Sequence, residues 1–93
     1  MNKYESVVIV NPDLDEAGLK AIETKITGLI NGNGKVESFE NMGKRKLAYE
    51  IKKKSEGVYF LYNFEANPEA ITEIERNYRI ADDIMKFIVI RKD

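Results

Sequence analysis

The first third of the chain combines a run of apolar residues with a helical apolar stripe. Residues 4–10 are rich in β-branched and aromatic side chains and predict a strand that ends at residues 11–13, Asn-Pro-Asp. Asp13 is followed three residues later by Glu16, a spacing typical of a helix start. The residues 31–34, Asn-Gly-Asn-Gly, tolerate positive φ and predict the end of this helix. Its apolar stripe, at steps of three and four, comprises Leu19, Ile22, Ile26, Leu29 and Ile30.

The middle of the chain predicts a pair of strands. Residues 35–42 alternate imperfectly, Gly43 interrupts the pattern, and residues 46–52 resume a period of two, so one long strand broken at the glycine is expected. Residues 55–57, Ser-Glu-Gly, predict a hairpin turn, and residues 58–65 predict the next strand.

The last third predicts a helix and a final strand. Asn67 before Pro68 is a favoured helix start, and residues 84–91 form a last apolar run. The order β-α-β-β-α-β matches the split βαβ unit. We therefore expect an α+β, ferredoxin-like sandwich in which two helices cover one face of a four-stranded antiparallel sheet. The first and third strands should be central, and residues 1–93 should form one domain.

The strands are too apolar for a sheet that has one open face. Two helices cover one face only, so polar residues should alternate along each strand, yet Val-Val-Ile-Val at 7–10 and Phe-Ile-Val-Ile at 87–90 do not alternate. The residues expected to face the helices are Tyr4, Val8, Val10, Phe60, Tyr62, Phe64, Phe87 and Val89. An apolar partner-protein interface is then predicted on the open face, made of Val7, Ile9, Tyr59, Leu61, Ile88 and Ile90. Alternatively, bulges bury some of these residues or a homodimer covers them.

Positive charge is concentrated on the predicted hairpin. The net charge is −1, but residues 44–54 contain six cations and only the acid Glu50, a local charge of +5. Such a cluster can neutralise phosphates although the rest of the chain is acidic. Neighbouring first and last strands would bring Lys3, Arg91 and Lys92 together and extend the cluster. The alternative is that the lysines protect a sheet edge from pairing with other chains. The RNA-binding candidates are Lys3, Lys44, Arg45, Lys46, Lys52, Lys53, Lys54, Arg91 and Lys92.

The composition leaves few routes to catalysis. Cysteine and histidine are absent, which removes thiolate nucleophiles, imidazole bases and the common zinc sites. No Gly-rich phosphate loop or nucleophile motif occurs, and no apolar run is long enough to span a bilayer. We therefore expect a cytoplasmic protein that is not an enzyme and has no cofactor, no metal, no small-molecule substrate and no membrane contact.

Residues 43–52, Gly-Lys-Arg-Lys-Leu-Ala-Tyr-Glu-Ile-Lys, closely resemble the signature segment of bacterial small-subunit ribosomal protein six. Residues 59–66 and the closing strand are similar to the same family, so the resemblance covers nearly the whole chain. It implies binding to the central domain of small-subunit (16S) ribosomal RNA as a heterodimer with ribosomal protein eighteen. Arg45 and Lys46 match the family's basic pair, with Lys44 beside them. Leu47, Tyr49 and Ile51 are expected to be structural, with Tyr49 packed inside.

Two alternatives from other classes are a non-ribosomal ferredoxin-like interaction module and a small hydrolase of the acylphosphatase type. The hydrolase needs an anion-binding arginine in the loop after the first strand, and residues 11–13 supply none. Many relatives extend beyond the last strand, whereas this sequence ends at Asp93, so we expect the folded surface to provide the partner contact.

Overall fold

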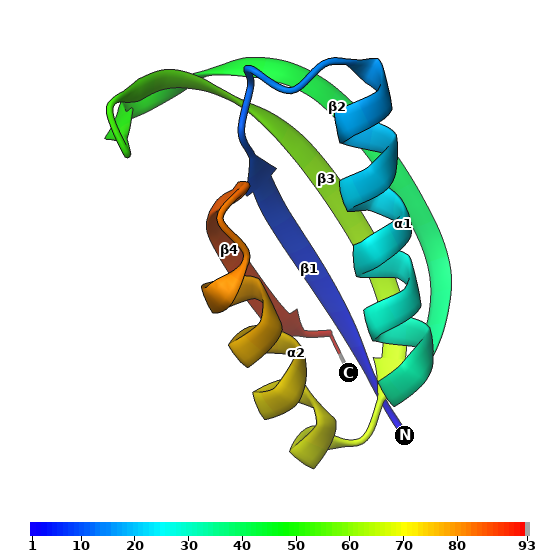
Figure 1. Cartoon of the computed structure of the whole chain (residues 1–93). Coiled ribbons are helices and arrows are strands. Elements are labelled where there is room, and N and C mark those ends of the chain that lie inside the picture. The colour runs from blue at the N-terminus through cyan, green and yellow to red at the C-terminus, as the bar shows by residue number, and fades with distance from the viewer. Residues whose placement is uncertain (93) are drawn as a thin grey trace.

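Four antiparallel strands form one sheet in the order β2-β3-β1-β4, and two helices cover one of its faces (Figure 1). This computed structural model describes residues 1–92, so the chain end at Asp93 lies outside the described residues. The predicted ferredoxin-like order is confirmed, with β1 and β3 in the centre of the sheet. The elements are β1 (Asn2–Val10), α1 (Glu16–Asn33), β2 (Gly34–Ile51), β3 (Lys54–Ala66), α2 (Pro68–Ile80) and β4 (Ile84–Arg91).

The core lies between the sheet and the helices. Val8, Phe60 and Phe64 from the central strands are fully buried there, against the apolar stripes of both helices. All eight residues that the alternation assigned to the helix-covered face belong to this core or pack on it, which confirms the predicted facing of the sheet. The opposite side, which carries no helix, is called the helix-free face below.

Strand β2 is long and irregular. The expected break is at Gly43, where φ is +85° and the pairing with β3 shifts between Asn41 and Gly43. Two further shifts occur, between Val36 and Ser38 and between Lys46 and Ile51. Bulges of this kind increase the local twist of a strand, and Figure 1 shows β2 and β3 curving together around the sheet.

The hairpin turn predicted at residues 55–57 is wrong. The turn consists of Lys52 and Lys53, which have φ values of 50° and 66°, and Ile51 pairs with Lys54 across it. Two left-handed residues form the two-residue turn that suits the twist of a hairpin, but Asn-Gly is the usual sequence there. Gly57 lies inside β3 instead, where a Cβ atom would overlap the side chain of Ile9.

The predicted start of the first helix needs correction, whereas its end at Asn33 lies within the predicted residues 31–34. Asp15, not Asp13, caps α1, since its carboxylate accepts a hydrogen bond from the Gly18 amide at 2.8 Å. The Asp13 amide donates instead to the Asn11 side chain, which closes the preceding turn. None of residues 31–34 has the positive φ that the sequence suggested. Gly34 is extended, and a Cβ there would overlap the Glu65 carbonyl oxygen, so close packing explains this glycine.

Candidate nucleic-acid and partner interfaces

Residues 44–54, named the basic hairpin here, bend over one end of the sheet (Figure 1). Lys54 forms an ion pair with Asp13 in the turn before α1. The Lys52 ammonium donates to the Ile84 carbonyl oxygen at 3.3 Å. These two lysines therefore attach the hairpin to the start of α1 and the start of β4, so part of their hydrogen-bonding capacity is used within the chain.

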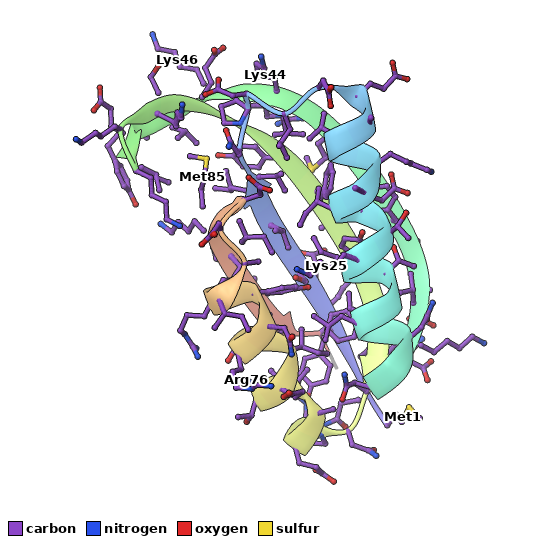
Figure 2. All side chains as sticks on the ribbon, in the orientation of Figure 1. Met1, Lys25, Lys44, Lys46, Arg76 and Met85 are labelled. Carbon is purple, nitrogen blue, oxygen red and sulfur yellow. The ribbon has the colours of Figure 1, made fainter. Side chains whose placement is uncertain are left out.

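Three other cations of the basic hairpin project into solvent. Lys44, Lys46 and Lys53 are exposed, and within residues 1–92 no acidic side chain lies within ion-pair distance of them. Lys44 and Lys46 are labelled at the outer edge of the hairpin in Figure 2. Because alternate residues of a strand point to opposite sides, these two share one side of β2. They form the most accessible positive charge of the segment.

Arg45 points to the other side of β2. Its guanidinium carbon lies 6.0 Å from the centre of the Tyr59 ring, at the limit of a cation–π contact. Tyr59 belongs to the helix-free face, where it lines a groove together with Ile9. Arg45 therefore borders the apolar surface, although it is adjacent in sequence to the two solvent-facing lysines.

The expected extension of the basic hairpin by Lys3, Arg91 and Lys92 is wrong. These residues do lie together, since the Lys92 amide donates to the Lys3 carbonyl oxygen at 2.8 Å and Arg91 pairs opposite Tyr4. However, Lys44 pairs with Val58, which pairs with Val10 on β1. Lys3 lies seven residues before Val10, about 23 Å away along the strand. The three cations are therefore at the opposite end of the sheet.

Acidic neighbours also lower the available charge at that end. The Lys3 ammonium lies 3.7 Å from a Glu37 carboxylate oxygen, and the Lys92 ammonium lies 3.8 Å from Glu5. Lys92 also donates to the Asn63 side-chain oxygen at 3.1 Å. Positive charge at this end is thus partly neutralised by the chain itself.

The middle of the helix-free face is apolar, as the strand pattern predicted, whereas its end near Lys3 carries polar side chains such as Glu5 and Asn63. Ile88 and Ile90 on the edge strand β4 are each 49% exposed. Val7, Tyr59 and Leu61 in the centre are half-buried. Aliphatic side chains therefore remain open to solvent along β1, β3 and β4, and edge strand β4 continues this surface to the border of the sheet.

Ile9, by contrast, does not belong to the exposed surface. It is 8% exposed and packs with Leu47 and Met85 in a second, smaller core. The cause is the irregularity in β2: between the pairs Lys46–Glu56 and Ile51–Lys54, the four residues 47–50 face only Ser55. This wide bulge brings Leu47 over the sheet and buries Ile9. The burial of Ile9 agrees with the alternative prediction that bulges bury some residues of the open face.

The same bulge forms the wall of a groove, named the hairpin groove here. Its volume is about 220 Å³, and it lies between the basic hairpin and strands β1 and β4. The lining residues are Val7, Ile9, Leu47, Ala48, Tyr49, Ile51, Tyr59, Lys86, Phe87 and Ile88. Most are apolar, so the groove is suited to bind an apolar group.

Tyr49 stands at the rim of the hairpin groove, not inside the core as expected. Its side chain is 63% exposed, because the wide bulge turns it away from the packed interior. The Lys86 ammonium donates to the Tyr49 hydroxyl at 2.8 Å and lies 5.4 Å from the ring centre. That hydrogen bond raises the pKa of Lys86, which therefore stays charged at the rim.

Lys86 and Ala48 line the hairpin groove but were not among the residues predicted from the sequence. Lys86 is the one cation between Ile84 and Ile90, at a position that alternation assigns to the helix-free face. That signal was readable from the sequence. The position of Ala48 in the groove could not be predicted from the sequence, because it depends on the bulge.

Within residues 1–92, no cluster of acidic side chains is suited to bind a metal ion. The helices described also include none that could cross a membrane.

The architecture defines a class of ferredoxin-like α+β proteins with a cationic hairpin and an apolar open sheet face. Comparison with known proteins makes this assignment specific. The family model described as ribosomal protein S6 matches residues 3–91, and the chain belongs to the ribosomal protein S6 family. It is therefore a structural protein of the small ribosomal subunit, and its place is the ribosome in the cytoplasm.

Relatives match over nearly their whole length. The small ribosomal subunit protein bS6 of Clostridium perfringens is 47% identical, with 100% of this chain and 99% of the relative covered. That of Clostridium beijerinckii is 50% identical, with 99% and 98% covered. The crystal structure of 30S ribosomal protein S6 from Thermotoga maritima superposes with a TM-score of 0.93 at 32% identity, covering 98% of this chain and 87% of that one. An Arabidopsis thaliana protein, 14% identical with a TM-score of 0.57, shares the fold alone.

Proposed function

We propose that the chain binds the central domain of small-subunit ribosomal RNA together with ribosomal protein eighteen, and that it uses separate surfaces for the two. The basic hairpin contacts RNA, and the helix-free face contacts the protein. The observation that carries the RNA assignment is the cluster of Lys44, Lys46 and Lys53, exposed and without an acidic partner in residues 1–92.

Phosphate contact suits these side chains. Ammonium groups on flexible stems neutralise phosphates and release counterions, which adds affinity without reading the base sequence. Such contacts position a protein on its RNA, which is the role a structural ribosomal protein requires. Lys52 and Lys54 would act mainly by holding the hairpin in place, because each already has a partner within the chain. Lys3, Arg91 and Lys92 would form a separate and weaker contact.

The partner assignment rests on exposed apolar area. Ile88 and Ile90 are half exposed on an edge strand, and Val7, Tyr59 and Leu61 continue the same surface. Contiguous apolar surface of this kind marks a protein interface, and its burial on association is favourable in proportion to its area. Positive charge is concentrated on the hairpin and apolar area on the open sheet face, which favours a protein that joins an RNA to another protein.

Charge reversal tests the RNA assignment. The variant Lys44→Glu/Lys46→Glu should bind a central-domain RNA transcript at least about tenfold more weakly in the presence of protein eighteen. The slope of log affinity against log salt should become shallower by about 2, one for each lost phosphate contact. Binding would be measured by filter retention between about 50 and 200 mM salt.

A matched control separates local contact from net charge. The variant Lys25→Glu/Lys35→Glu changes the net charge equally at two exposed lysines outside the hairpin and should keep near-native affinity. Equal losses in both variants would show a general charge effect. Unchanged binding by the hairpin variant would exclude this surface as the RNA contact.

A further inference from the structure

The hairpin groove has the size of one side chain. Pockets for small-molecule ligands usually measure about 300–1,000 Å³, whereas this groove measures about 220 Å³. A cavity of about 150 Å³ is already large enough for benzene. An apolar recess of this volume therefore suits a single aromatic or large aliphatic side chain better than a cofactor or a strand.

The rim of the groove adds a requirement for charge. Lys86 lies beside Tyr49 on one wall, and Arg45 lies over Tyr59 on another. No carboxylate in residues 1–92 forms an ion pair with either cation. A group that enters the groove therefore meets Lys86, which belongs to its lining, while Arg45 lies at the Tyr59 ring outside the lining. A carboxylate next to the inserted side chain would neutralise the Lys86 ammonium.

We propose that the hairpin groove is an anchor site that receives one large apolar side chain of the partner protein, with an acidic residue of the partner beside it on Lys86. This inference rests on the proposed function, since it specifies how the helix-free face binds protein eighteen. A single buried anchor surrounded by weaker contacts is the usual way in which an interface concentrates its affinity.

The groove favours an amino-acid side chain over an RNA base. A stacked base would use the faces of Tyr59 and Tyr49, and a cation already occupies one face of each ring, Arg45 at Tyr59 and Lys86 at Tyr49. The remaining lining, with Val7, Leu47, Ile88 and Phe87, is apolar. Apolar walls of this kind favour an apolar side chain over the polar edges of a base.

The first test fills the groove from within. Ala48 is exposed at the lining, so Ala48→Trp should occupy the recess and weaken binding of protein eighteen at least about tenfold, measured by titration calorimetry. Ala17→Trp, at an exposed position on α1, is the matched control and should bind normally. Thermal unfolding of each variant shows whether it folds.

The second test concerns the rim charge. Lys86→Glu should weaken the same complex several-fold, while Lys35→Glu, which makes the same charge change at the far end of β2, should not. Native affinity in both Ala48→Trp and Lys86→Glu overturns the anchor site. If the unmodified chain itself does not bind protein eighteen, the proposed function fails, and this outcome is distinct from the first.

The third test identifies what enters the groove and does not depend on tolerance of a tryptophan. The chain has no cysteine, so Glu50→Cys, at an exposed position beside the rim and outside the groove lining, provides one unique attachment point for a photoactivated benzophenone label. In the complex with protein eighteen and RNA, cross-links should map to one large apolar residue with Asp or Glu within two positions. Cross-links to RNA, or to scattered partner residues, would overturn the proposal.

Discussion

At the scale of single residues, Gly57 allows the helix-free face to pack. It lies buried within β3, and a Cβ atom there would overlap the Ile9 side chain, which is held by Leu47 and Met85. Ile9 is β-branched and has little freedom to move aside. The absence of a side chain at position 57 is therefore what allows β1 and the wide bulge of β2 to meet.

We predict that Gly57→Ala lowers the free energy of unfolding by about 1–3 kcal/mol, because overpacking displaces neighbouring side chains. Urea unfolding followed by circular dichroism measures this change. Gly28→Ala is the control: a Cβ at Gly28 meets no atom within 4 Å, and alanine is the better helix former, so this variant should gain up to about 1 kcal/mol. Equal stability of the native protein and Gly57→Ala would contradict the packing role.

The same residue shows how far sequence reasoning reached. Serine and glycine at 55–57 carry the local composition of a turn, and composition alone favoured a turn there. The requirement that placed Gly57 in a strand is a long-range contact with Ile9, forty-eight positions earlier, which no local pattern contains. The predicted helix start was wrong by only two residues. Asp13 and Asp15 are both suitable caps by sequence, and only the backbone geometry selects Asp15.

At the scale of elements, the turn between β2 and β3 is built from residues poorly suited to it. Lys52 and Lys53 both have left-handed backbone conformations, which cost non-glycine residues about 1–2 kcal/mol each. The contacts of Lys52 with Ile84 and of Lys54 with Asp13 offset part of this cost. Two lysines at this turn place positive charge at the end of the basic hairpin.

We predict that Lys52→Asn/Lys53→Gly raises the free energy of unfolding by about 1 kcal/mol, since Asn-Gly is the preferred sequence for this turn. The control Lys52→Gln/Lys53→Gln removes the same charges without favouring left-handed backbone and should not be stabilised. Denaturant unfolding at moderate salt compares the two. A similar gain in both variants would attribute the effect to charge repulsion among the lysines.

At the scale of the whole molecule, two buried tyrosines connect the sheet to both helices. Tyr78 on α2 shares a hydrogen bond of 3.0 Å with Ser6 on β1. The Tyr62 hydroxyl on β3 donates to the Glu23 carbonyl oxygen on α1 and lies 3.2 Å from the Thr27 hydroxyl. Burial raises the pKa of each phenol to about 12. Both contacts therefore depend on neutral side chains.

We predict a loss of stability in alkaline solution. The folded state holds these phenolic protons up to about pH 12, whereas the unfolded chain releases them near pH 10. The stabilisation is thus complete below pH 10 and is lost between pH 10 and 12. Tyr78→Phe should flatten this decline in urea unfolding at increasing pH. A native slope in Tyr78→Phe would contradict the assignment.

The strand order and the facing of the core residues could be predicted, because β1, β3 and β4 each present helix-facing apolar residues at steps of two. The position of Lys3 and Lys92 relative to the basic hairpin could not be predicted. Lys3 and Lys92 were correctly brought together by strand pairing, but their distance from Lys44 depends on the register along the sheet. The hairpin groove also depends on the three-dimensional path of residues 47–50.

The strand order has a consequence for how the chain is made. The first strand to be synthesised, β1, lies between two later ones, and the Lys3 and Lys92 backbones are joined near the ends of the chain (Figure 1). A nascent chain from which β4 has not yet emerged therefore lacks one of the two neighbours of its central strand β1. The sheet closes only when β4 has joined it, so a copy that lacks β4 leaves one edge of β1 unpaired and part of its core uncovered.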